Sequence, residues 1–239
     1  MPEVLQPKDP AGVETLEIMS AAPQYNSWMY QAIAPFLGTR ILEVGSGIGN
    51  MSAHLLSARP ARLVLTDMDP WYRDQVGRRF GDHAEVTVSA LTLPDPDASQ
   101  RFSSERLDTV VALNVVEHIG DDVGAMTSMR QMLVPGGRAV ILVPALPSIY
   151  GELDRELGHF RRYVHAIAHR NPSQYNPPKH THTHTPISSC LTLKCSDSNK
   201  IYYLETTDKF NIHCNNFSFV FLQLIYGNMF AKKEECIYA

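Results

Sequence analysis

Apolar residues recur along the first two thirds of the chain as short β-rich runs separated by segments with helical spacing. The runs predict five strands, at residues 41–45, 63–67, 84–90, 107–114 and 138–144. The intervening segments predict helices at 50–58, 71–80 and 121–133, and another helix over 25–37 precedes the first strand. Because the first run, ILEVG, is apolar on both faces, it suits a central parallel strand covered by helices. The alternation predicts an α/β fold with a Rossmann-like, doubly wound, mostly parallel sheet.

The composition changes abruptly after Tyr163. Up to that residue the chain has 20 acidic and 14 basic residues and 13 glycines, whereas the last 76 residues have 7 bases, 5 acids, one glycine and all four cysteines. This second part also contains the repeat HTHTHT at 180–185, which is typical of low-complexity sequence. We therefore divide the chain into an N-terminal lead-in (1–24), a domain (25–163) and an atypical tail (164–239) that we do not expect to be a native domain.

The charge and hydropathy exclude several classes of partner. A formal net charge of −4 gives no basic surface for nucleic acid. The longest mostly apolar run, 217–225, is too short to span a bilayer, and the first residues lack a basic, apolar signal pattern. The cysteines form no C-x-x-C pair, so no metal site is expected. These features predict a cytoplasmic protein without membrane or nucleic-acid partners, and they leave its oligomeric state open.

A glycine-rich loop follows the first predicted strand, at the sheet edge where ligands bind in doubly wound folds. Its pattern is Glu43-x-Gly45-x-Gly47-x-Gly49. The dinucleotide fingerprint G-x-G-x-x-G would need glycine at Asn50, and an acid such as Glu43 is a poor neighbour for a pyrophosphate. The loop therefore favours a ligand with local positive charge, such as S-adenosylmethionine, over a nicotinamide dinucleotide.

An acidic residue ends the second predicted strand, at the distance from the glycines expected for a ribose ligand. Asp67 directly terminates LVLT, so its carboxylate is the candidate to accept hydrogen bonds from both ribose hydroxyls. Asp69 is the rival, but its place before Pro70 suits the cap of the next helix. Met68 would then flank the adenine ring as a polarisable, apolar contact.

Four segments occur in order, LEVGSGIGN, LVLTDMDP, LDTVVALNVVEHIGD and LVPGGRAVILVP. Together they make residues 25–163 resemble the class I S-adenosylmethionine-dependent methyltransferases of the small-molecule type. The resemblance implies the cofactor S-adenosylmethionine and methyl transfer to a small-molecule substrate whose identity the sequence does not give. It also implies cofactor contacts by three groups of residues: Glu43, Gly45, Ser46, Gly47 and Gly49; Asp67, Met68, Ser89, Ala90 and Leu91; and Asn114 and Val115.

The resemblance does not assign a catalytic residue. His118 is a weak candidate for a base, since imidazole titrates near neutral pH. The resemblance implies that the Glu117–His118 pair more often orients the loop and the start of the next helix. Tyr25, Asn26 and Trp28 could cover the cofactor or pack in the core. Residues 145–163 could contact a polar or anionic substrate or form an amphipathic surface helix.

The resemblance also implies two further strands that close the sheet as an antiparallel pair beside the fifth. Residues after Tyr163 offer no convincing counterpart, so these strands are expected to be missing or replaced; residues 217–226 could supply one. The alternative function is therefore a catalytically inactive, truncated cofactor-binding module. We expect limited proteolysis to cut first between about 165 and 200.

Overall fold

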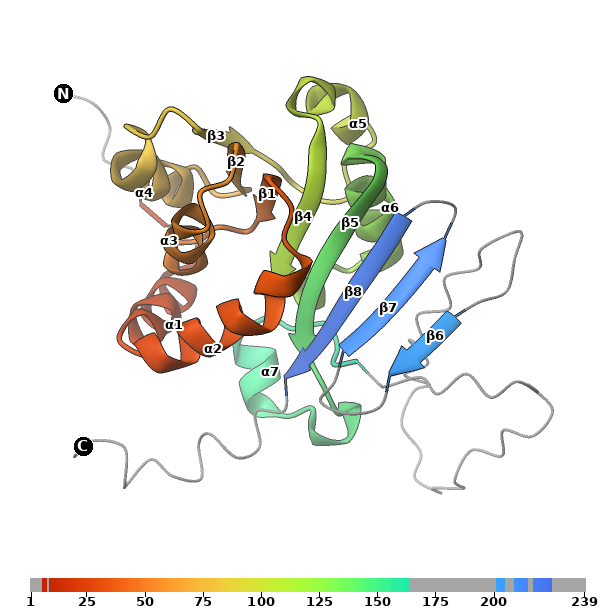
Figure 1. The fold of residues 1–239 in the computed structure, drawn as a ribbon. Helices are drawn as coiled ribbons and strands as arrows, with labels where there is room; N and C mark the ends of the chain where they lie inside the picture. Colours follow the sequence, from red (N-terminus) through yellow and green to blue (C-terminus); the bar gives the residue numbers. More distant parts are fainter. Residues whose placement is uncertain (1–5, 8, 164–200, 205–208, 215–216, 225–239) are drawn as a thin grey trace.

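The computed structural model describes residues 6–7 and 9–163, together with the backbone of 201–204, 209–214 and 217–224 (Figure 1). The first five strands are β1 (Arg40–Val44), β2 (Arg62–Asp67), β3 (Val86–Ala90), β4 (Leu107–Leu113) and β5 (Leu133–Pro144). The longer helices are α1 (Pro10–Ser20), α2 (Pro23–Ile33), α3 (Asn50–Ser57), α4 (Pro70–Phe80) and α6 (Asp122–Met132). The shorter ones are α5 (Ala98–Arg101), α7 (Glu152–Glu156), η1 (Ala34–Phe36), η2 (Ser103–Glu105), η3 (Val116–His118) and η4 (Pro147–Ile149).

The first five strands form an all-parallel sheet in the order β3-β2-β1-β4-β5. The order reverses at β1, which pairs with β2 on one side and β4 on the other, as the doubly wound prediction requires. The predicted Rossmann-like fold is therefore confirmed. β5 begins earlier than predicted, because Leu133 already pairs with Leu107 before the register shifts and Arg138 pairs with Thr109.

Helices cover both faces of the sheet. Alternate residues of each strand point to opposite faces and pack against different helices. On one face, Ile41 of β1 packs in a core with Ile33 of α2 and Leu55 of α3. On the other face, the neighbouring Leu42 packs in a second core with Met126 and Met129 of α6. Burial on both faces explains why the strands read as continuous apolar runs.

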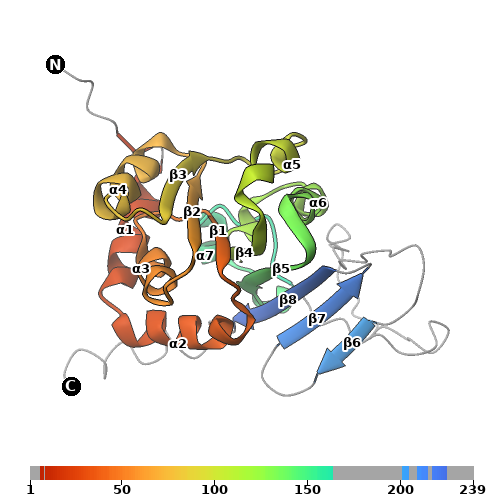
Figure 2. The same ribbon diagram turned by 45° about the horizontal axis from the view of Figure 1, so that its top comes forward.

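The sheet continues beyond β5 with three strands from the segment assigned to the atypical tail. These are β8 (Phe217–Leu224), β7 (Lys209–Cys214) and β6 (Ile201–Leu204), in that order outward from β5 (Figures 1 and 2). β8 runs parallel to β5, with Val140 opposite Val220, and only β7 and β6 are antiparallel to their inner neighbours. The expected closing pair is thus replaced by a different arrangement that covers the edge of β5.

The division of the chain at 163/164 stays a prediction. The repeat at 180–185 and three of the four cysteines lie outside the described residues, and Cys214 ends β7. Within the described part of the chain, no helix combines the length and apolar content needed to cross a membrane.

Candidate functional site

The candidate site lies at the carboxyl edge of the sheet, where parallel β1, β2, β3 and β4 all end. The loop after β1 turns there with positive φ at three glycines, 69° at Gly45, 52° at Gly47 and 86° at Gly49. Residues that carry a side chain rarely adopt positive φ angles of this kind. A Cβ at Gly45 would also lie 2.7 Å from Val115 Cγ2, and one at Gly49 would lie 2.5 Å from Phe80 Cε2. The glycines are therefore required both for the turn and for close packing.

Asp67 at the end of β2 is tied directly to this loop. Its Oδ2 accepts a hydrogen bond from the backbone N–H of Gly47 at 3.1 Å, and its Oδ1 accepts one from the N–H of Asp69 at 2.9 Å. The side chain is buried, which raises the pKa of Asp67, while the two N–H donors oppose that rise. Asp69 caps α4 by accepting from Trp71 N at 2.9 Å, as its position before Pro70 suggested.

Glu43 lies beneath the loop as the second buried acid of the site. Its Oε2 accepts a hydrogen bond from Ser52 Oγ of α3 at 2.5 Å, and its backbone carbonyl accepts one from Thr66 Oγ1. Burial raises the pKa of Glu43 to about 8, although the Ser52 hydrogen bond opposes this rise. At neutral pH the Glu43 carboxyl therefore carries a proton in a large fraction of molecules, and a nearby cation would favour its ionised form.

Ser46 and Asn114 complete the inner wall of this edge. The Ser46 side chain is buried beside Glu43, where its hydroxyl opposes the rise in the pKa of Glu43, and its backbone N–H donates to the Thr66 carbonyl at 2.9 Å. Asn114, directly after β4, has a positive φ of 53° and donates its backbone N–H to the Leu142 carbonyl. Ser46 and Glu43 therefore form one polar pair at the inner wall of this edge.

The residues proposed for the adenine side lie at the ends of β2 and β3. Met68 is 60% exposed and therefore available to a ligand. Ser89 and Ala90 end β3, and the Ala90 carbonyl accepts a hydrogen bond from Arg101 Nη2 at 2.5 Å. Leu91 is buried in the core on the α6 face. Nothing in the sequence indicated that Arg101 would contact the end of β3.

His118, the weak catalytic candidate, lies one turn beyond Asn114 in η3. Loss of hydration, and then the adjacent His159, lower the pKa of His118 to about 4. A lowered pKa leaves the imidazole neutral at physiological pH and makes it a weaker base, while the His118 side chain itself is exposed, and its role as a base stays a prediction. The preceding Glu117 is fully buried, and burial raises its pKa to about 8.

The N-terminal helix α1 covers the glycine loop, a feature that the sequence analysis did not find. Leu16 of α1 approaches Gly47 so closely that a Cβ there would lie 2.8 Å from Leu16 Cδ1. The side chain of Asn50 fixes the helix by donating to the Leu16 carbonyl at 2.9 Å. The available signal was Asp9 before Pro10, which does cap α1 through Gly12 N. Of the residues predicted to cover the cofactor, Asn26 is buried and donates to the Met19 carbonyl, and Trp28 is half exposed.

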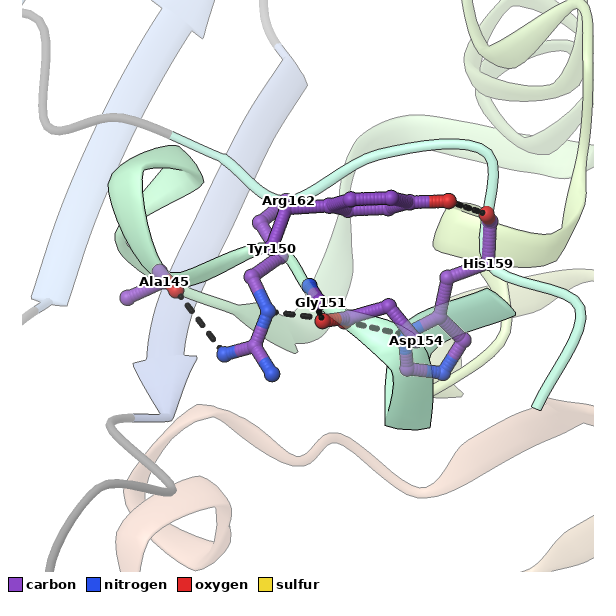
Figure 3. A network of polar contacts seen from close by, with 6 residues as sticks. All are labelled: Ala145, Tyr150, Gly151, Asp154, His159 and Arg162. Carbon is purple, nitrogen blue, oxygen red and sulfur yellow. Dashed lines mark hydrogen bonds and ion pairs between the residues drawn. The ribbon is translucent and has the colours of Figure 1, made fainter. Parts of the chain in front are cut away.

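Residues 145–163 form an ordered excursion that returns to the end of β5 (Figure 3). Asp154 is its centre, since it accepts hydrogen bonds from Arg162 Nε at 2.7 Å and from the backbone N–H of Gly151 at 2.9 Å. Tyr150 donates to the His159 carbonyl at 2.7 Å. Arg162 and His159 are thus buried in an internal network, and this excursion is not a simple surface helix.

The fold and the glycine loop define a Rossmann-like domain with a ligand edge at β1, β2 and β4. Residues 42–139 match the family model described as "Methyltransferase domain". This match to a methyltransferase domain is consistent with the class I S-adenosylmethionine-dependent methyltransferases that the sequence resembles.

Curated relatives share this part of the chain. A ubiquinone biosynthesis O-methyltransferase of Cereibacter sphaeroides is 30% identical over 106 residues, which cover 44% of this chain and 41% of that protein. A squalestatin hexaketide synthase of a Phoma species is 27% identical over 116 residues, covering 45% of this chain and 4% of the synthase. The chain thus spans less than half the length of these relatives. Among solved structures, the DszA carbon methyltransferase is similar with 28% identity and a TM-score of 0.39, covering 49% of this chain and 34% of that one.

Proposed function

We propose that this domain transfers the methyl group of S-adenosylmethionine to a small-molecule acceptor, with Asp67 and the glycine loop holding the cofactor. The main support for this proposal is the Asp67 carboxylate, which is buried at the end of β2 and accepts hydrogen bonds from Gly47 N and Asp69 N. A carboxylate has about four acceptor sites, so about two stay available for the two ribose hydroxyls. The fixed backbone donors hold the carboxylate in position before the cofactor arrives.

The charge at this edge supports a cationic rather than an anionic ligand. Burial first, and then the carboxylates of Asp9, Asp67 and Asp69, raise the pKa of Tyr72 to about 12. Three carboxylates thus gather around Tyr72 of α4, beside the loop. A pyrophosphate would be repelled there, whereas the ammonium and sulfonium groups of S-adenosylmethionine would be attracted.

The chain's own residues would provide binding and orientation. Glu43 and Ser46 are the candidates for the methionine end, Asp67 for the ribose, and Met68 with Ser89, Ala90 and Leu91 for the adenine side. Asn114 and Val115 would face the methionine end from β4. The bound cofactor supplies an electrophilic methyl group, so in-line positioning of the acceptor and exclusion of water account for much of the catalysis.

A small molecule is the proposed acceptor because the O-methyltransferase relative is named for ubiquinone biosynthesis. We further propose a cytoplasmic protein that needs neither nucleic acid nor a membrane, in keeping with its net charge of −4.

The test is calorimetric titration of the full chain with S-adenosylhomocysteine, using Asp67→Ala against Asp74→Ala as a matched control. Asp74 lies on α4 and pairs with Arg78 at the surface, away from the loop. Asp67→Ala should weaken binding by about 1–3 kcal/mol, because the ribose hydroxyls lose their acceptors. Equal affinity of the two variants would contradict the proposed role of Asp67.

A turnover assay separates an enzyme from the inactive module. The full chain is incubated with S-adenosylmethionine and a panel of phenols and 1,3-dicarbonyl compounds, and S-adenosylhomocysteine release is measured. Release that depends on an acceptor supports the proposal. Tight cofactor binding without turnover on any acceptor favours the catalytically inactive module.

A further inference from the structure

A fully buried carboxylate without a partner lies beside the candidate cofactor edge. Glu117 is 0% exposed, and neither of its carboxylate oxygens has a hydrogen-bond partner within the described part of the chain. Its backbone is satisfied, because the Glu117 carbonyl accepts from Phe160 N at 2.8 Å. A buried acid without hydrogen bonds is costly, so the position calls for a ligand that binds carboxylate oxygen.

Two imidazoles converge on this carboxylate. The rings of His118 and His159 meet edge to face with centroids 4.7 Å apart. One ligand atom from each of Glu117, His118 and His159 can be chosen so that all lie within 4.8 Å of one another. A tetrahedral ion with bonds of roughly 2.0–2.2 Å separates its ligand atoms by roughly 3.3–3.6 Å. Small side-chain rotations would therefore bring these three groups onto one ion.

The neighbouring network prepares His159 for such a role (Figure 3). Its Nδ1 lies 2.9 Å from Asp154 Oδ1, and Asp154 is held in turn by Arg162 and Gly151. Asp154 accepts hydrogen bonds from both of those donors, so its contact with His159 fits an Nδ1–H donor and leaves Nε2 with its lone pair. A carboxylate that orients a histidine in this way is typical of metal ligands.

We propose that Glu117, His118 and His159 bind one divalent transition-metal ion of the zinc type. Two imidazoles and one carboxylate suit zinc and disfavour magnesium or calcium, which prefer all-oxygen sites. Three protein ligands leave a fourth position open, as in zinc sites that bind a water or a substrate. This proposal departs from the sequence-based expectation of no metal, since His159 is 41 positions from His118 and no short motif joins them.

The position of these three ligands suggests a role for the ion in the proposed reaction. Glu117 follows Asn114 by three residues, so the proposed ligand group starts directly beyond the end of β4, beside the proposed cofactor site. A metal there would polarise an acceptor oxygen and ease its deprotonation. This use rests on the proposed function, whereas metal binding itself does not.

The test titrates Co²⁺ alone into the full chain and follows visible ligand-field absorption, with Zn²⁺ as competitor. All variants carry His180→Ala, His182→Ala and His184→Ala, so that the histidine repeat cannot contribute. We expect one Co²⁺ per chain, displaced by Zn²⁺. Glu117→Gln and His159→Ala should each weaken binding at least about tenfold, and Asp154→Asn about 10–100-fold. His83→Ala, a histidine near Glu85 on the surface, is the matched control and should change nothing.

Two results would overturn the proposal. One is a folded chain that binds no Co²⁺ once the repeat is replaced. The other is Co²⁺ binding that Glu117→Gln leaves unchanged, with circular dichroism showing that the variant is folded. Titration of the same samples with S-adenosylhomocysteine distinguishes this failure from failure of the cofactor proposal.

Discussion

Two regions of the carboxyl edge differ in how completely their buried carboxylates are hydrogen-bonded. Around the glycine loop, Asp67 accepts two backbone hydrogen bonds and Glu43 accepts one from Ser52. Around η3 and the 145–163 excursion, Asp154 is fully engaged by Arg162, Gly151 and His159, while Glu117 beside it has no partner among the described residues. In the first region the bonds join neighbouring elements and satisfy both acids, whereas in the second the bonds of Asp154 close within residues 151–162 and leave Glu117, on a different segment, without a partner.

The largest expected effect concerns the ion pair of the second region. Arg162→Met should lower the free energy of unfolding by about 3–5 kcal/mol, because it leaves Asp154 buried without its cation. Both side chains of this pair are at least 95% buried, with exposures of 5% and 1%. Arg78→Met, which removes a surface pair with Asp74, should cost no more than about 0.5 kcal/mol. Chemical denaturation measures both, and similar losses would mean that the network does not stabilise the excursion.

The next effect tests the glycine loop of the first region. Gly49→Ala should destabilise the fold by about 2–4 kcal/mol, from the strained backbone together with a clash. The new Cβ would lie 2.5 Å from the Phe80 ring, which is buried in the core. Gly136→Ala is the control, since its φ of 84° is equally unfavourable but no atom lies within 4 Å of the added Cβ. Thermal unfolding that finds the two variants equally unstable would refute the packing argument.

A pH comparison probes the buried Glu43. Because its pKa is about 8 when folded and about 4.5 when unfolded, the folded state holds a proton that the unfolded state loses between these values. The free energy of unfolding therefore falls as pH rises from about 4.5 to 8, by about 1.4 kcal/mol for each unit of difference. Glu43→Gln cannot titrate, so it should remove this fall in the free energy of unfolding between pH 5 and pH 8. Urea denaturation at pH 5 and pH 8 checks this, and an unchanged slope would mean that Glu43 is ionised throughout.

The smallest effect concerns the link between α1 and the loop. Asn50→Ala should cost about 0.5–1.5 kcal/mol, because the Leu16 carbonyl loses its donor. If α1 covers the cofactor edge, the same change should also speed amide exchange along residues 10–20 more than in α6. If residues 10–20 exchanged at the same rate in the wild type and the variant, α1 would be held in place by its other contacts alone.

The same contrast explains what the sequence could predict. The five parallel strands followed from short apolar runs, and Asp67 and the three glycines followed from their spacing around β1 and β2. These features are local in the chain or repeat at fixed intervals. The cover of Leu16 over Gly47 and the approach of His159 to Glu117 depend on tertiary contacts that no spacing reveals. The parallel pairing of β8 with β5 was also unpredictable, since 217–226 only indicated a strand and not its direction.

The most direct test of the central claim is the ligand preference of the glycine-loop edge. The full chain is titrated by calorimetry at neutral pH with S-adenosylhomocysteine and, separately, with reduced nicotinamide dinucleotide. The account predicts saturable one-to-one binding of S-adenosylhomocysteine, because Asp67 and Glu43 favour a ligand without phosphate, and no heat from the dinucleotide. No binding of S-adenosylhomocysteine to folded protein at millimolar concentration, or binding of the dinucleotide instead, would contradict it.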